Sequence, residues 1–172
     1  MKNILSILGA ITLVGTSTIS LVACNKPQYS EDELKKEKEE NKIKTNNKEI
    51  RDNLEWMASQ EKPIHKLDNK WYYVCWRPEI NLPWRLANFK NEKEQRYHKF
   101  DEVDKYFIHI GELDEVDNFD ILINHTPSSI WNLKSWQKNG EDYIKYVYRW
   151  NLNTSKPDLV IDNDGNLKVK GE

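Results

Sequence analysis

The pattern of hydrophobic and polar positions divides the chain into three stretches. Residues 4–23 form an apolar run, diluted toward its end by glycine, serine and threonine. Residues 30–60 are strongly charged, and from about residue 66 apolar and polar positions alternate, with many aromatic and β-branched residues. These patterns predict a membrane-related segment, a helical segment and a set of β-strands, in that order.

The charged stretch begins with a helix signal. Ser30 followed by Glu33 fits a capping box, in which each side chain accepts a hydrogen bond from the backbone of the other residue. Residues 30–42 have almost no apolar side chain, so we expect a solvated, frayed helix or a disordered stalk there rather than a coiled coil. A second helical piece, over about 47–60, is expected to dock on the rest of the chain through an apolar stripe. That stripe consists of Ile43, Ile50, Leu54 and Met57, with Trp56 beside it.

The alternating stretch predicts a small antiparallel β domain. Candidate strands are 70–77, 84–90, 106–110, 119–124, 130–136 and 142–150, with 158–161 and 166–169 as a terminal hairpin. Asn139-Gly140, between two apolar runs, is the best single hairpin signal. Residues 91–103 fit either a turn of helix or a long polar hairpin. Sequential short strands favour an antiparallel meander, closed as a barrel or packed as a sandwich. The fold class predicted is therefore mainly β, preceded by an N-terminal helical stalk.

The side-chain alternation in two of these strands indicates which of their faces are buried. Strand 70–77 is apolar on both faces, so it is either central and covered from both sides, or it offers one aromatic face to a ligand. In strand 142–150 we expect one face, with Ile144, Tyr146, Tyr148 and Trp150, to be core and the other to be amphipathic surface.

The tryptophans are the candidate ligand-binding residues. A stacking platform for sugar rings or planar groups could be formed by Trp71, Trp76, Trp84, Trp131 and Trp136, with Trp150. The alternative is that they fill the core of a small sheet, since each aromatic side chain buries a large area. We take core packing as the default.

The apolar run has the features of a cleaved secretory signal. Lys2 provides a basic start, and small residues precede the junction Leu21-Val22-Ala23-Cys24. This junction resembles the lipobox of bacterial lipoproteins. The resemblance implies cleavage between Ala23 and Cys24 and a diacylglyceryl group on the Cys24 sulfur. The alternative is an uncleaved membrane helix, because about 20 apolar residues suffice to span a bilayer.

Both ends of the chain also resemble surface lipoproteins of spiroplasmas and related wall-less bacteria (mollicutes). The resemblance is carried by the start MKNILSILGAITL, the junction LVACNKP, the C-terminal stretch YIKYVYRWNLNTSKPDLVIDNDGNLKVKGE, and the abundance of Lys and Asn. It implies a cell-surface lipoprotein of undefined activity, attached to the extracellular face of the cell membrane. It transfers one functional residue, Cys24.

The expected organisation is a signal peptide (1–23), a lipidated cysteine with a flexible lead and a charged helical stalk (24–60), and a β domain (61–172). The chain has 26 basic and 28 acidic residues, a net charge of −2. This balance gives no electrostatic reason to expect binding to nucleic acid or to an anionic membrane surface. The membrane is therefore the expected partner through the lipid anchor, with an extracellular protein or a saccharide as further candidates.

Little in the chain points to catalysis, a metal or a cofactor, and we expect none of the three. Cys75 is the only cysteine besides Cys24, so we expect a buried, inert thiol. The sequence Asp162-Asn163-Asp164-Gly165-Asn166 resembles the start of a calcium loop, but its glycine comes too early, so we interpret it as a hairpin turn. The histidines have no spacing typical of a metal site: His65, His98, His109 and His125.

The function predicted is a non-catalytic surface lipoprotein with a binding or display role. Two alternatives are a lipoprotein that captures a saccharide or another small molecule for a transporter, and a secreted hydrolase. The hydrolase would use carboxylates of the acidic stretch between Asp101 and Asp117, which we expect to be solvated loops.

Overall fold

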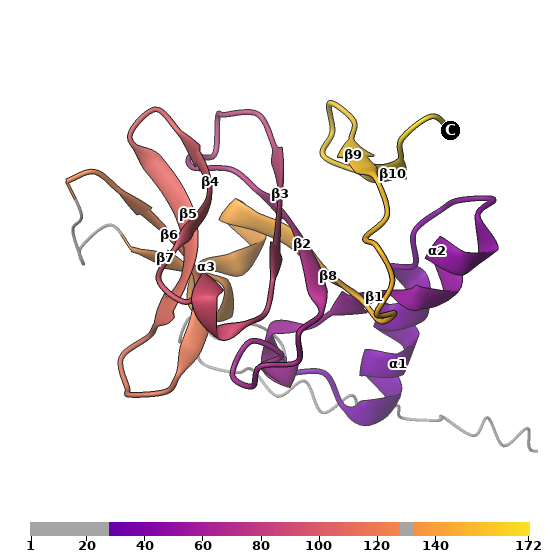
Figure 1. Ribbon diagram of the computed structural model, residues 1–172, viewed down its shortest axis with the longest axis horizontal. Coiled ribbons are helices and arrows are strands. Elements are labelled where there is room, and N and C mark those ends of the chain that lie inside the picture. The colour runs from indigo at the N-terminus through magenta and orange to yellow at the C-terminus, as the bar shows by residue number, and fades with distance from the viewer. Residues whose placement is uncertain (1–27, 128–132) are drawn as a thin grey trace, which may run out of the picture.

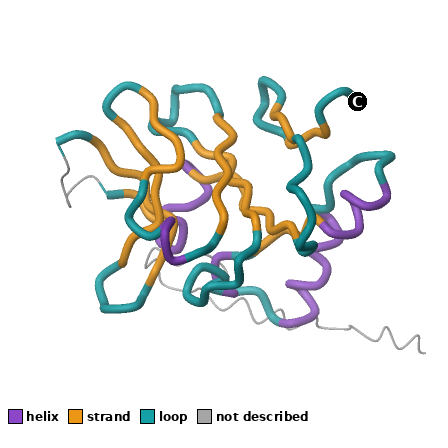
Figure 2. Tube along the Cα trace, viewed as in Figure 1, coloured by secondary structure: helices purple, strands orange, loops and turns teal. Residues whose placement is uncertain are grey.

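The computed structural model describes residues 28–127 and 133–172, and their fold is mainly β, as predicted. Two four-stranded sheets and one two-stranded sheet are all antiparallel. Figure 1 shows the arrangement in layers: the sheet with β4–β7, then the sheet with β1, β8, β2 and β3, then α1, α2 and the β9–β10 hairpin. Figure 2 shows how short the helices are beside the strands and loops.

The central sheet has the strand order β1-β8-β2-β3. Its strands are β1 (Leu54–Met57), β8 (Ile144–Trp150), β2 (Trp71–Trp76) and β3 (Arg85–Lys90). Because β2 is an inner strand with a packed layer on each face, both of its faces are apolar. This confirms the first of the two interpretations of that pattern, a central strand covered on both sides.

The second sheet is a sequential meander. It contains β4 (Lys99–Val103), β5 (Tyr106–Glu112), β6 (Phe119–His125) and β7 (Lys134–Ser135), in that order. Its apolar face meets one face of the central sheet in the first core, which includes Tyr72, Val74, Trp76, Phe89, Ile108, Ile110, Ile121, Ile123 and Val147. The described strands form separate sheets that face each other across this core, so they do not close into a barrel.

The opposite face of the central sheet is also covered. Here α1 (Glu31–Glu40), α2 (Lys48–Asn53) and the hairpin of β9 (Leu159–Ile161) and β10 (Leu167–Val169) form the third layer. The second core beneath this layer contains Ile43, Ile50, Leu54, Tyr73, Tyr148, Trp150 and Leu159. The expectation that one face of strand 142–150 is surface is therefore wrong, because Val147 lies in the first core and Tyr148 in the second.

The N-terminal helices are shorter than predicted. The capping box of Ser30 and Glu33 is present at the start of α1. The helix expected over 47–60 is correct only for Lys48–Asn53, because residues from Leu54 onward pair with β8 as strand β1. A short 3-10 helix η1 (Ser59–Glu61) follows β1. The apolar spacing in this region fits a helix and a short strand equally well, and the pairing with a distant strand decides between them.

The hairpin predicted at Asn139-Gly140 is wrong. These residues lie inside helix α3 (Trp136–Tyr143), with Ser135 as its N-cap. The Ser135 side chain accepts a hydrogen bond from the Lys138 backbone, and the Asp120 carboxylate accepts one from the Gln137 backbone. Trp136 is buried in the first core, so tertiary packing and two caps override the local turn preference.

Two further segments differ from the expected strands. Residues 91–103 contain both alternatives, a 3-10 helix η2 (Lys93–Gln95) and then strand β4. The strand expected over 130–136 is limited to β7 within the described part of the chain, and Trp136 already begins α3. Residues 130–132 lie outside the described residues. The terminal hairpin is confirmed as β9–β10.

Helix α1 is held against the edge of the central sheet. None of its residues is buried, but Lys38 Nζ lies 2.5 Å from Glu55 Oε1 and 2.6 Å from Glu61 Oε1. Glu55 belongs to the edge strand β1 and also accepts a hydrogen bond from Arg149 at 2.9 Å. Covering an edge strand with a helix removes the unpaired strand that could otherwise recruit another chain.

Candidate functional site

A groove of about 390 Å³ lies on the outer side of the central sheet. We call it the tyrosine groove. One wall is the segment 40–44 after α1, the other is the turn and second strand of the β9–β10 hairpin, and the floor is β8. Its lining residues include Glu40, Lys42, Ile43, Lys44, Tyr146, Tyr148, Asp162, Asn166, Leu167 and Lys168. The volume is in the range of sites for small molecules, about 300–1,000 Å³.

The floor is aromatic but its hydroxyl groups are already engaged. Tyr146 and Tyr148 contact each other edge to face, with ring centroids 5.7 Å apart and an interplanar angle of 62°. The Tyr148 hydroxyl donates to the Asn41 carbonyl at 2.6 Å, and the Tyr146 hydroxyl donates to the Gly165 carbonyl. Burial raises the pKa of both phenols, so both stay neutral donors near pH 7.

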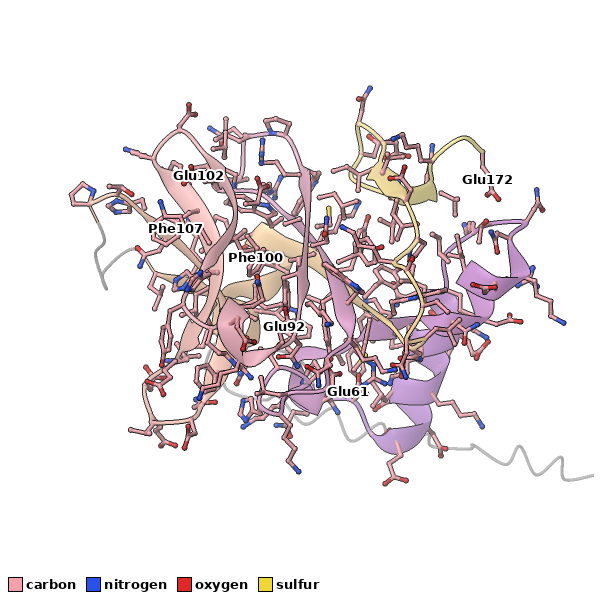
Figure 3. All side chains as sticks on the ribbon, in the orientation of Figure 1. Glu61, Glu92, Phe100, Glu102, Phe107 and Glu172 are labelled. Carbon is pink, nitrogen blue, oxygen red and sulfur yellow. The ribbon has the colours of Figure 1, made fainter. Side chains whose placement is uncertain are left out.

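The hydrogen bonds donated by these two tyrosine hydroxyls connect the floor to both walls. Asn41 belongs to the wall after α1, and Gly165 belongs to the hairpin wall. A third link joins the segments that follow the two walls, because Thr45 Oγ1 donates to the carboxylate of Glu172 at 2.7 and 2.8 Å. Glu172 is labelled in Figure 3, close to the hairpin. Hydrogen bonds therefore connect both walls of the groove to its floor.

The rim carries charges of both signs. Lys168 lies 3.0 Å from Asp162, and Lys42 lies 2.7 Å from Glu39. Lys44 is exposed, and within the described part of the chain it has no ion pair. Mixed, largely paired charge suits a polar ligand of low net charge better than a polyanion.

Among the described residues, the tryptophans considered from the sequence do not form a platform. Trp76 is 0 % exposed and Trp136 is 4 % exposed, and both lie in the first core. Trp150 is buried in the second core. Trp71 and Trp84 are half-buried, and Trp131 lies outside the described residues. Because Trp76 and Trp136 contribute to a core between two sheets, they have no free face for a ligand.

Trp71 and Trp84 each lie close to a cation. The Arg77 guanidinium lies 4.3 Å from the Trp84 ring centroid, and Lys156 Nζ lies 4.7 Å from that of Trp71. The buried Trp76 donates through Nε1 to Asp101 at 2.9 Å, and Arg85 pairs with the same carboxylate at 2.8 Å. Asp101, at the start of the acidic stretch, is therefore a structural acceptor.

Cys75 is buried as predicted, with 1 % of its surface exposed. Burial raises the pKa of its thiol to about 12. Its Sγ donates to the Gly165 carbonyl at 3.5 Å, beneath the hairpin. A thiol that stays protonated and covered is not a nucleophile.

The calcium-like sequence forms the hairpin turn expected of it. The Asp162 carboxylate accepts hydrogen bonds from the backbone of Asp164 at 3.1 Å and of Asn166 at 2.8 Å. Among the described residues, no three His, Cys, Asp or Glu side chains are grouped to hold a metal ion. His109 is half-buried, and burial lowers its pKa.

The sequence missed Tyr146 and Tyr148 as site residues. The alternation of strand 142–150 predicts a core position for both, and Tyr148 does belong to the second core. Only the position of the C-terminal hairpin, which leaves space above β8, makes them the floor of a groove. No local pattern carries that information.

Comparison of the chain with protein-family models, curated proteins and solved structures finds no match. The helices within the described residues are all too short or too polar to cross a membrane. Cys24 and Ala23 lie outside the described residues. Any function proposed for the chain therefore has to come from its own sequence and geometry.

Proposed function

We propose that the protein is a lipid-anchored binding protein on the extracellular face of a cell membrane, resembling mollicute surface lipoproteins. The observation that carries this proposal is the junction Leu21-Val22-Ala23-Cys24 at the end of an apolar run with a basic start. Two acyl chains on the Cys24 sulfur would satisfy the two-signal condition for stable membrane attachment. The role is binding or display, without catalysis.

Removal of the anchor tests the proposal. Cys24→Ala leaves the apolar run unchanged but removes the sulfur that would carry the lipid. Cells grown with radiolabelled palmitate should incorporate label into the wild-type protein and not into the variant. Label in the variant, or none in the wild type, would contradict the anchor. Cys75→Ala is the matched control and should be labelled like the wild type, because Cys75 is buried in the folded domain.

The tyrosine groove supports a binding role over pure display. Its volume, aromatic floor and mixed-charge rim are typical of a site for a small polar molecule such as a saccharide. Capture of such a ligand for a transporter is the second candidate function.

A thermal-shift screen of residues 25–172 tests the groove, with mono- and oligosaccharides, nucleosides and amino acids as the probes. A probe held at 100 times its Kd should stabilise the fold by about 2.7 kcal/mol. Lys44→Glu should reduce that shift, because Lys44 lines the groove. Lys48→Glu makes the same charge change nearby, outside the lining, and should not. Equal effects of the two variants, or no shift with any probe, would contradict the groove as a ligand site.

A further inference from the structure

We infer that the protein meets its membrane through the corner formed by Tyr29, Trp56 and Gln60, here called the Tyr29 corner. The partner is the lipid surface in which the protein is anchored, and the distance to that surface is set by residues 24–28 rather than by the helices that follow. This inference rests on the proposed lipid anchor at Cys24.

Tyr29 is part of the folded domain. Its backbone N–H donates to Gln60 Oε1 at 2.6 Å, and its carbonyl accepts from Gln60 Nε2 at 2.8 Å. Its ring contacts that of Trp56 edge to face, with centroids 6.4 Å apart and an interplanar angle of 71°. Since Trp56 lies in β1 and Gln60 in η1, the chain is fixed to the domain before α1 begins.

The reach of the tether follows from covalent geometry. Tyr29 comes five residues after Cys24 in the sequence. A fully extended chain spans at most about 3.6 Å per residue, so Cys24 can lie no more than about 18 Å from Tyr29 in any conformation. The Tyr29 corner is therefore held near the bilayer.

Helix α1 cannot act as a spacer between the lipid and the domain. It begins after Tyr29, and near its far end Lys38 is paired with Glu55 and with Glu61, which is labelled in Figure 3. A helix fixed to the domain at both ends adds nothing to the distance between the anchor and the domain. Its 10 residues extend about 15 Å, from the Tyr29 corner to Glu40 at the wall of the tyrosine groove.

The tyrosine groove adjoins this corner, because Trp56 pairs with Tyr148 of the groove floor and Tyr146 lines both the groove and the small cavity at the corner. In Figure 1, α1 lies below α2 and the β9–β10 hairpin lies above both. The chemistry of the corner suits an interfacial position, because tyrosine and tryptophan are enriched at the level of lipid headgroups. Both rings are half-buried, and they line a small cavity of about 70 Å³.

Energy transfer from the protein to the bilayer tests this orientation. A donor dye is placed on Ser59→Cys, beside the corner, or on Lys105→Cys, in the exposed β4–β5 turn of the second sheet, on the other side of the first core. The engineered thiol is the single reactive one, because the Cys24 sulfur carries lipid and Cys75 is 1 % exposed. The full lipidated protein is reconstituted into phosphatidylcholine vesicles that carry an acceptor dye on the headgroup. Transfer should be higher from Ser59→Cys than from Lys105→Cys, and equal or reversed efficiencies would overturn the orientation.

Two insertions separate a short tether from a helical stalk. A Gly-Ser insertion between Pro27 and Gln28 lengthens the tether and should lower transfer from Ser59→Cys. The same insertion between Thr45 and Asn46 lies beyond the docked helix and should leave transfer unchanged. An equal drop with both insertions would show that the helix is a spacer and overturn the inference. Flotation of the vesicles comes first: protein that does not float refutes the proposed anchor itself, and with it this inference.

Discussion

Gly165 is the residue on which the close packing of the C-terminal hairpin depends. Its φ angle is +75°, and a Cβ atom at this position would lie 2.6 Å from Cγ of Trp84. Its carbonyl also accepts hydrogen bonds from Tyr146 and Cys75. A residue with a side chain would have to adopt a disfavoured backbone conformation and displace an indole ring at the same time.

We therefore expect Gly165→Ala to lower the free energy of unfolding by about 2–4 kcal/mol, from left-handed strain and overpacking together. Gly171→Ala is the matched control, since its φ is +93° but nothing lies within 4 Å of the added Cβ. Gly171→Ala should lower the free energy of unfolding by at most about 1–2 kcal/mol, because only the strain of the left-handed backbone contributes. Urea denaturation of both variants measures the difference, and equal losses would show that the contact with Trp84 is unimportant.

Asp162 makes the hairpin turn sensitive to acid. The hydrogen bond from the Asn166 backbone, followed by that from Lys168, lowers the pKa of Asp162 to about 2, from an ordinary 3.8. Because the folded-state pKa is below the unfolded one, this stabilisation is complete above about pH 4 and is lost as the pH falls through about 2.

The free energy of unfolding should consequently fall more steeply between about pH 4 and pH 2 for the wild type than for Asp162→Asn. Urea denaturation at several pH values measures the two slopes. The same slope in both proteins would mean that the Asp162 carboxylate is not held by the turn.

At the residue scale, features that depend on neighbouring residues were predicted better than the burial of individual side chains. The capping box of Ser30, the turn at Asp162 and the buried state of Cys75 follow from local chemistry, and all three are confirmed. The abundance of tryptophan is equally visible, but a sequence does not state which face of a sheet is covered. Trp76 therefore fits a ligand platform and a core equally well until the second sheet is placed against it.

At the element scale, α1 is the clearest case of an element fixed by contacts distant in sequence. Burial alone would raise the pKa of Glu55, but hydrogen bonds from Lys38 and Asn151 outweigh this effect and hold the pKa below its usual value. Lys38 also forms an ion pair with Glu61, so one cation on the helix pairs with two partly buried carboxylates.

Lys38→Met should lower the free energy of unfolding by about 1–3 kcal/mol, since both carboxylates lose a charged donor. Amide hydrogen exchange in α1 should accelerate in the same variant. Lys36→Met is the control in the same helix, because the Lys36–Glu40 pair is 3.4 Å long and mostly exposed. It should change stability by about 0.5 kcal/mol or less. Similar losses in both variants would mean that α1 is not fixed through Lys38.

Strand β1 shows why some strands could not be predicted from the sequence. Leu54 and Met57 continue the apolar stripe of a helix, yet they pair with Trp150 and Val147 near the other end of the chain. Likewise β8 lies between β1 and β2, so the central sheet is not the simple meander expected. The second sheet, with the order β4-β5-β6-β7, is such a meander. Non-local pairing of this kind leaves no local trace, while alternating runs such as β2 and β5 were found directly.

At the scale of the whole molecule, the third layer brings the proposed anchor end and the candidate binding site together. The Tyr29 corner follows the proposed anchor by five residues, and Trp56 of that corner pairs with Tyr148 of the groove floor. The anchor was readable from sequence alone, whereas the groove depends on a hairpin wall and a helix wall that meet only in the folded chain.

The most direct test of the account is the mass of the N-terminal peptide of the protein purified from membranes. The account predicts a peptide that begins at Cys24, lacks residues 1–23 and carries a diacylglyceryl group on the cysteine sulfur. A peptide that begins at Met1, or an unmodified Cys24, would contradict the lipid anchor and the membrane orientation derived from it.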